Sequence, residues 1–127
     1  MEPRPFIKDQ SWKARWLCFG HAARGIGIHI STQANARIQG IAALLIAGLS
    51  WALGLSAMEW CAVVGAIGLV WVAEMFNTAI EFLVDFVSPN IHPLAGRIKD
   101  VAAGAVLVSS LTAAVIGAII FLPKLLR

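Results

Sequence analysis

Four polar side chains recur at helical spacing inside an otherwise apolar part of the sequence. Glu74, Asn77, Glu81 and Asp85 stand three or four residues apart in "EMFNTAIEFLVD", which places them on one face of an α-helix in a stripe about 80° wide. Two carboxylates seven residues apart can bind a divalent cation and leave another group free as a base, because Mg²⁺ takes a few carboxylates together with phosphate oxygens. This polar stripe therefore favours phosphoryl transfer.

A second polar segment, "GRIKD", follows the stripe and supplies Arg97, Lys99 and Asp100. A lysine there can neutralise phosphate charge, although Arg97 fits an interfacial anchor equally well. His92 lies in the intervening loop "SPNIHP", where a histidine is either solvated or part of a site. The sequence holds neither a glycine-rich nucleotide loop nor an HExxH motif, so a nucleotide needs an unusual binding site.

The helix that carries the stripe is predicted to cross a membrane. The chain has 127 residues, of which 59% are hydrophobic, and a mean hydropathy of +0.80, which predicts a single membrane domain over residues 1–127. Segments 38–55, 60–86 and 101–122 are each long enough to span the bilayer. Residue 74 lies about 21 Å along the second span from residue 60. Glu74 is therefore expected inside the hydrocarbon, and Asp85 near the headgroups.

The segment before these spans is predicted to be an amphipathic surface helix. Trp12, Trp16 and Phe19 recur at helical spacing, which indicates an interfacial helix over residues 6–30, within the N-terminal segment 1–30. By position, His21 and His29 are interfacial residues rather than ligands. Six of the ten Lys and Arg residues lie in residues 1–37, which predicts a cytoplasmic N-terminus.

The net charge, the small residues and the cysteines bear on the partners of the chain. The net charge of +3 suits anionic lipid or phosphate, and no nucleic-acid partner is expected. Ser110, Ala114 and Ala118 repeat at four-residue spacing, which allows helices to approach closely and predicts an oligomer. The two cysteines are 43 residues apart, without a CxxC motif, and are expected to fill space rather than to form a disulfide or a metal site.

The two polar motifs together resemble one family. The string "EMFNTAIEFLVD" followed by "IHPLAGRIKDVAAGAVLV" is similar to the small prokaryotic lipid kinases that act on diacylglycerol or undecaprenol. The segments "GHAARGI" and "NARIQ" also look like the surface helix and the first membrane-helix entry of that family, so the resemblance covers most of the chain.

The resemblance implies an all-α integral membrane protein with an N-terminal surface helix and three transmembrane helices. It also implies a homotrimer in the bacterial cytoplasmic membrane, with active sites between protomers at the cytoplasmic boundary. ATP would donate a phosphoryl group to a membrane lipid alcohol, either undecaprenol or diacylglycerol, with Mg²⁺ as cofactor.

The resemblance also assigns roles to residues. Glu74 would be the catalytic base and Glu81 a Mg²⁺ ligand. The predicted nucleotide-binding residues are Asn77, His92, Lys99, Asp100 and, on the surface helix, His21. Gln33 stands where the best-known members have a second metal-binding acid, and an amide oxygen is a weaker Mg²⁺ ligand than a carboxylate.

Two readings of the stripe do not involve catalysis. The polar residues can hold neighbouring helices together, although such contacts usually use Ser, Thr, Asn or Gln rather than three acids. Alternatively, the chain can be a cation pathway or an assembly subunit lined by the acidic stripe. A pathway requires the stripes to converge on a central axis, whereas the kinase requires them at separate protomer boundaries.

Overall fold

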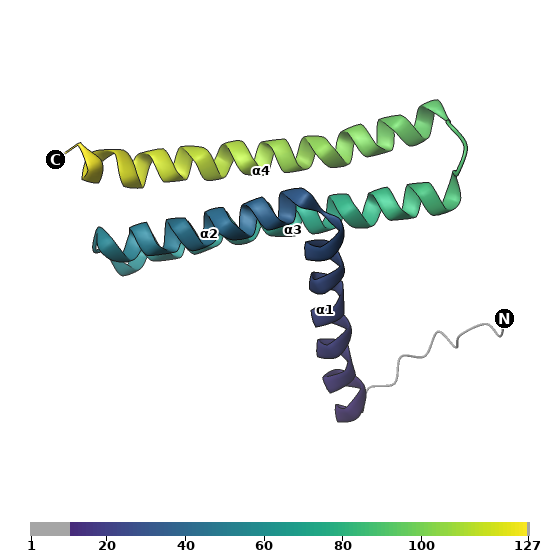
Figure 1. Cartoon of the computed structure of the whole chain (residues 1–127), viewed down its shortest axis with the longest axis horizontal. Coiled ribbons are helices and arrows are strands. Elements are labelled where there is room, and N and C mark those ends of the chain that lie inside the picture. The colour runs from purple at the N-terminus through teal and green to yellow at the C-terminus, as the bar shows by residue number, and fades with distance from the viewer. Residues whose placement is uncertain (1–10, 127) are drawn as a thin grey trace.

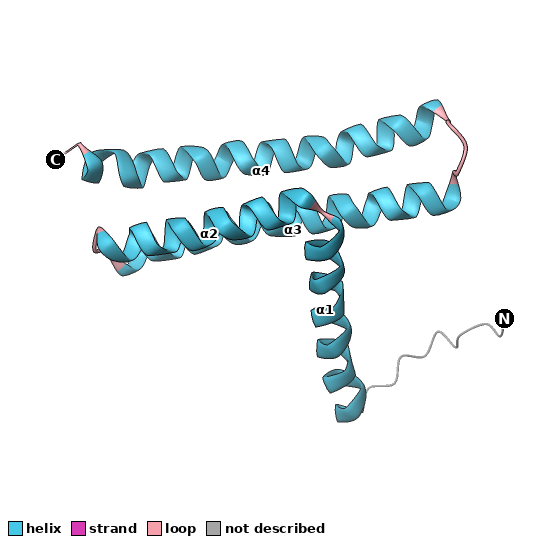
Figure 2. Ribbon diagram, viewed as in Figure 1, coloured by secondary structure: helices cyan, strands magenta, loops and turns pink. Residues whose placement is uncertain are grey.

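The computed structural model describes residues 11–126, which fold into four helices without a strand (Figure 2). They are α1 (Trp12–Thr32), α2 (Ala34–Ala52), α3 (Ala57–Val87) and α4 (Pro93–Leu125). The helices α3 and α4 form a long antiparallel hairpin, α2 lies along α3, and α1 leaves the bundle almost at a right angle (Figure 1). The predicted all-α architecture is confirmed for this part of the chain.

The sharp corner between α1 and α2 is made by one residue, Gln33. Its extended backbone (φ −107°, ψ 117°) ends α1, and its N–H donates the last helical hydrogen bond, to the carbonyl of His29. Ser31 and Thr32 donate their hydroxyls to the carbonyl of Ile28 and do not cap α2. The predicted surface helix thus continues two residues beyond residue 30, and residues 1–10 of the predicted segment lie outside the described residues.

The helix α4 begins eight residues before the predicted third span, at Pro93 instead of residue 101. Pro93 occupies the first turn, where its fixed φ favours a helix and its missing N–H costs nothing. The Nδ1 atom of His92 accepts the N–H of Leu94 at 3.1 Å and caps the helix. "GRIKD" therefore lies on the first turns of α4, which fixes its side chains relative to α3.

The opposite end of the bundle is closed by the turn between α2 and α3. Gly54 adopts the positive φ of 62° that this turn requires, and Ser56 and Glu59 form a reciprocal capping box at the start of α3. Glu59 also pairs with Lys124 near the end of α4, at 3.2 Å. These contacts join the ends of three helices.

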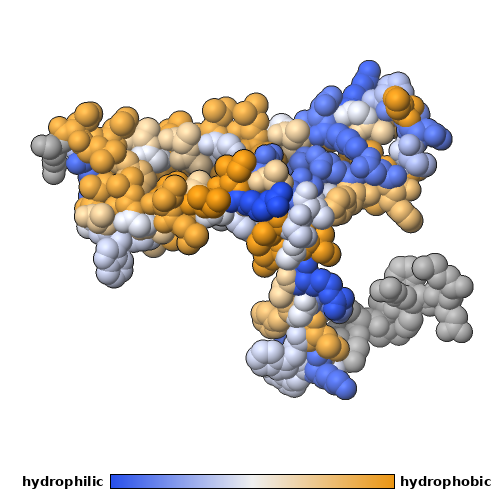
Figure 3. Space-filling view, viewed as in Figure 1, coloured by the Kyte–Doolittle hydropathy of each residue, from blue (hydrophilic) through white to orange (hydrophobic). Residues whose placement is uncertain are grey.

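Two of the described helices, α3 and α4, are long and apolar enough to cross a membrane. The predicted first span, residues 38–55, falls mostly on α2, which does not meet the same test because Asn35, Arg37 and Gln39 lower the hydropathy of its first turns. Apolar residues cover the end of the bundle near the C-terminus, and hydrophilic residues gather at the α3–α4 loop (Figure 3). This asymmetry is typical of a protein with one end in lipid and the other in water.

Candidate functional site

The polar stripe of α3 shows a steady change in burial along the helix. Glu74 is 5% exposed, Asn77 and Glu81 are half-buried, and the Asp85 side chain is 64% exposed. All four project from the same face of the helix, in the order that the sequence pattern predicts. The stripe thus connects the packed interior of the bundle to the surface at the α3–α4 loop.

The buried carboxylate of Glu74 is held by a residue of α2. The Nε2 atom of Gln39 donates a hydrogen bond of 2.8 Å to Oε1 of Glu74. A donor is needed here because a buried carboxylate without one is costly. Gln39 is not among the predicted site residues, although it is the only polar side chain between residues 38 and 49. That isolation within an apolar run is the signal that could have identified it.

His29 is buried, which contradicts its prediction as an interfacial residue. It is 3% exposed, its Nδ1 lies 3.2 Å from Oγ1 of Thr78, and its ring meets the edge of the Trp71 ring at 6.0 Å. Helical spacing alone could not reveal this burial, because the sharp corner at Gln33 is what turns the end of α1 onto α3. The contact between His29 and Thr78 is the second contact in the site that the sequence did not predict.

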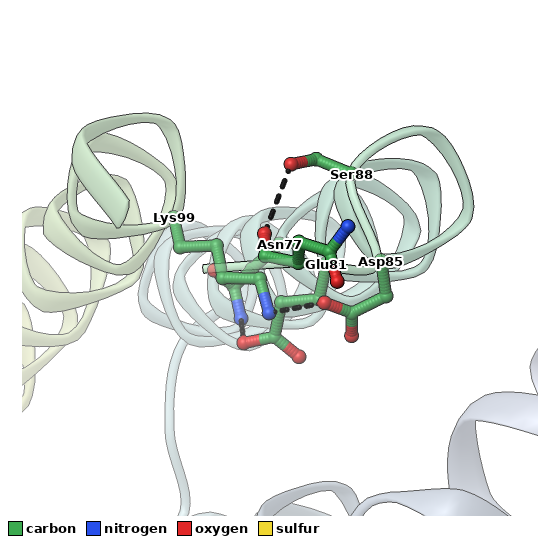
Figure 4. A network of polar contacts seen from close by, with 6 residues as sticks. Asn77, Glu81, Asp85, Ser88 and Lys99 are labelled. Carbon is green, nitrogen blue, oxygen red and sulfur yellow. Dashed lines mark hydrogen bonds and ion pairs between the residues drawn. The ribbon is translucent and has the colours of Figure 1, made fainter. Parts of the chain in front are cut away.

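A hydrogen bond joins two residues of the outer part of the stripe, and an ion pair joins the stripe to α4 (Figure 4). Asn77 donates its amide N–H to Oε1 of Glu81 at 3.0 Å. Lys99, which α4 places opposite the end of α3, pairs with Asp85 at 2.5 Å. The pair is partly exposed, with side-chain exposures of 38% for Lys99 and 64% for Asp85, so it contributes only about 0.2–1 kcal/mol to stability. Lys99 can therefore exchange Asp85 for another anion at little cost.

His92 stands at the start of α4, seven residues before Lys99, and one of its ring nitrogens is occupied. Because its Nδ1 accepts the N–H of Leu94, the neutral ring carries its proton on Nε2. The side chain is exposed, so Nε2 is available as a donor. Asp100 is also exposed and follows Lys99 on α4.

Two of the predicted residues, His21 and Gln33, make no side-chain hydrogen bond to the other predicted residues. His21 is exposed on α1, eight residues before His29, or about 12 Å along the helix axis. Gln33 is half-buried at the corner between α1 and α2, and its side chain makes no capping bond. A single protomer brings neither residue into hydrogen-bonding contact with Glu81.

The donor groups of the site suit a cation that arrives with phosphate. Among the described residues, no three His, Cys, Asp or Glu side chains gather closely enough to hold a metal ion. Mg²⁺ is commonly bound by one or two carboxylates, with substrate phosphates and water completing its octahedron. Glu81, whose carboxylate is only half-buried and accepts one amide bond, fits that kind of ligation.

The site lies entirely within a recognisable family domain. Residues 20–121 match the sequence profile of prokaryotic diacylglycerol kinase. The chain belongs to this family. The match includes every predicted site residue, from His21 to Asp100, and it confirms the family indicated by the two sequence motifs.

Several relatives in this family carry names that describe their substrates. The chain is 41% identical to the undecaprenol kinase of Bacillus subtilis strain 168, over 84% of this chain and 87% of that protein. It is 35% identical to a diacylglycerol kinase of Synechocystis, over 94% of this chain and 71% of that protein. The identity to the diacylglycerol kinase of Escherichia coli K12 is 30%, over 76% of this chain and 79% of that protein.

Proposed function

We propose that this protein is an ATP-dependent lipid kinase that phosphorylates a membrane-resident alcohol at the cytoplasmic boundary of the bacterial cytoplasmic membrane. The observation that carries the proposal is the burial gradient along α3. A buried carboxylate, Glu74, stands on the same helix face as groups that become exposed toward Lys99. A lipid hydroxyl can reach the buried end from the bilayer, and a nucleotide can reach the exposed end from water.

In the proposed reaction, Glu74 is the general base. Its Oε1 is held by Gln39, which leaves Oε2 to accept the proton of the lipid hydroxyl. The lipid oxygen forms a bond to the γ-phosphorus of ATP as the bond from that phosphorus to the β,γ-bridging oxygen breaks, and ADP leaves. The proton then passes from Glu74 to solvent, which restores the base.

The outer residues hold the nucleotide and screen its charge. Lys99 exchanges Asp85 for phosphate, His92 donates through Nε2, and Asn77 and Asp100 complete the nucleotide site. Mg²⁺, when bound, neutralises charge that develops on the transferring phosphoryl group. Glu81 would hold that ion, with Gln33 as a second ligand.

Replacing Lys99 with Met is expected to raise the KM for ATP by about tenfold or more, because a cation at the phosphates is lost. The matched control is Asp85→Asn, which removes the same ion pair but keeps the lysine and should leave the KM for ATP nearly unchanged. Initial rates measured against ATP at saturating lipid give both values. Equal increases of the KM for ATP in the two variants would indicate that the KM rises through loss of the ion pair and not through loss of phosphate binding by Lys99.

We further propose three transmembrane helices and a cytoplasmic N-terminus. Residues 57–78 of α3 rise about 31 Å, close to the roughly 30 Å of hydrocarbon, and Thr78 is where α1 meets α3. The helix α2 has 19 residues and is about 28 Å long. It therefore also spans the core if α1 lies in the membrane interface at the level of Thr78. Glu74 then lies about 6 Å below the interface.

A homotrimer with sites between protomers is also part of the proposal. Only 22% of the apolar window of α3 and 11% of that of α4 are buried inside the protomer. Ala114 and Ala118 are both exposed on α4, where small side chains allow a second helix to approach closely. The site of one protomer can therefore be completed by His21 or Gln33 of a neighbouring protomer.

Undecaprenol is the proposed physiological substrate, with diacylglycerol as the alternative. The support is the higher identity to the undecaprenol kinase than to the two diacylglycerol kinases, at 41% against 35% and 30%. We expect purified protein in mixed micelles to give a kcat/KM at least about tenfold higher for undecaprenol, a difference of about 1.4 kcal/mol. A preference for diacylglycerol would reverse the assignment and leave the kinase activity in place.

A further inference from the structure

Three buried polar atoms have no hydrogen-bond partner among the described residues, and all three belong to side chains around one turn of α3. They are Nε2 of His29, Oε1 of Gln39 and Oδ1 of Asn77. Leaving such an atom unpaired in the interior costs about 1–3 kcal/mol. Since buried polar atoms are nearly always paired, their concentration around Glu74 indicates that a polar group binds here.

His29 lies over the turn of α3 that carries Glu74. It contacts Trp71 through its ring and Thr78 through Nδ1, and these residues stand three positions before and four positions after Glu74. Residues at this spacing occupy one side of a helix, within about 60° of one another. The imidazole therefore lies on the side of α3 that carries Glu74, with Nδ1 bonded to Thr78 and Nε2 without a hydrogen-bond partner among the described residues.

An apolar cavity adjoins one side of this cluster. Gln39 and Trp71 also line a cavity of about 140 Å³ between α2, α3 and α4, whose other walls are apolar. The exposed end of the stripe, where Asp85 pairs with Lys99, lies toward the C-terminal end of α3, away from this cavity. A group that reaches His29 from the cavity side is therefore attached to an apolar molecule rather than to a nucleotide.

We propose that His29 binds the hydroxyl oxygen of the lipid alcohol through Nε2. In this arrangement Thr78 donates its hydroxyl proton to Nδ1, which leaves the ring proton on Nε2 to donate to the lipid oxygen. The lipid O–H then remains free to donate to Oε2 of Glu74. This assignment rests on the proposed lipid kinase function and adds a substrate-binding residue from α1.

Two substitutions separate the roles of the two ring nitrogens. The amide oxygen of Asn can occupy the position of Nδ1 and accept the Thr78 hydroxyl, and the amide nitrogen of Gln can occupy the position of Nε2 and donate to the lipid oxygen. His29→Asn should keep the bond to Thr78 and raise the KM for the lipid alcohol by about tenfold, the value of one buried hydrogen bond. His29→Gln should stay within about threefold of wild type, and both variants should keep the wild-type KM for ATP. Ser50→Ala, which removes a buried hydroxyl at the far end of α2, is the control and should change neither constant.

The reverse order, with His29→Gln impaired and His29→Asn normal, would show that His29 only anchors α1 and would overturn the proposal. Equal values for the two variants, whether normal or impaired, would also overturn it. Imidazole ¹⁵N spectra of the protein in micelles give an independent test without ATP. Adding undecaprenol or diacylglycerol should shift the Nε2 resonance of His29 more than that of Nδ1, and an unchanged spectrum would contradict binding. Wild-type protein that binds the alcohol in this way but transfers no phosphate would instead contradict the kinase function.

Discussion

Replacing Glu74 with Gln is expected to lower kcat by about 10²–10⁴-fold, the usual contribution of a general base. The substitution keeps the size of the side chain, and its amide oxygen can still accept the bond from Gln39 that the structure shows at 2.8 Å. The variant should therefore fold, assemble and bind both substrates nearly as the wild type does. Initial rates of lipid phosphorylation in mixed micelles measure the loss of kcat, and gel filtration measures assembly.

The matched control for this variant is Glu59→Gln, at the other end of α3. A glutamine can replace glutamate in the capping box that Glu59 forms with Ser56, so this variant should keep kcat close to the wild-type value. Turnover at the wild-type rate in Glu74→Gln would remove Glu74 from the role of base. A loss of assembly in that variant would instead assign the carboxylate to helix packing, as the non-catalytic interpretation of the stripe requires.

Replacing Glu81 with Ala is expected to raise the Mg²⁺ concentration needed for half-maximal activity by on the order of 10- to 100-fold. Loss of a group that only orients a metal ligand typically lowers metal affinity by about 10- to 100-fold, and loss of a carboxylate that binds the ion directly should lower it at least as much. Gln33→Glu should act in the opposite direction, because a carboxylate is a stronger ligand than an amide oxygen. Titrating Mg²⁺ at saturating ATP and lipid measures both shifts.

An unchanged Mg²⁺ titration in Glu81→Ala would exclude Glu81 as a ligand. An unchanged titration in Gln33→Glu would exclude Gln33 alone, and this outcome is separable because Glu81 bonds to Asn77 and not to Gln33 in one protomer. Glu59→Gln again serves as the control, since the same charge is removed far from the site.

The sequence predicts the polar stripe well because the stripe is local. Glu74, Asn77, Glu81 and Asp85 belong to one continuous helix, so the 3.6-residue period alone places them on one face, and their burial follows from their order along α3. The family is equally accessible from the sequence, because the two motifs that identify it are continuous strings. The sequence does not predict that α4 begins eight residues before the third span, because the capping by His92 depends on backbone geometry in a short loop.

The contacts of Gln39 and His29 were missed because they join residues far apart in the chain. Gln39 meets Glu74 across 35 positions, and His29 meets Thr78 across 49. The contact of His29 depends on the extended backbone of Gln33, which turns α1 away from the bundle axis. The contact of Gln39 depends on the turn at Gly54, which lays α2 along α3. A single sequence shows the polarity of such residues but not the direction from which they approach.

The structure also bears on the alternative of a cation pathway. Along α3, the residues between Glu59 and Glu74 are all uncharged, and the cavity beside this part of the helix is lined almost entirely by apolar side chains. A route for a cation needs polar groups or water along its whole length. The stripe ends at Glu74, which fits a site at one membrane boundary better than a path across the bilayer.

The most direct test of the central claim is transfer of labelled γ-phosphate from ATP to a lipid alcohol by the purified protein, measured beside cation flux through the same protein in liposomes. We predict labelled lipid phosphate that requires ATP, lipid and Glu74, with no flux above that of protein-free liposomes. Cation flux without labelled lipid, for undecaprenol and diacylglycerol alike, would contradict the proposed kinase function.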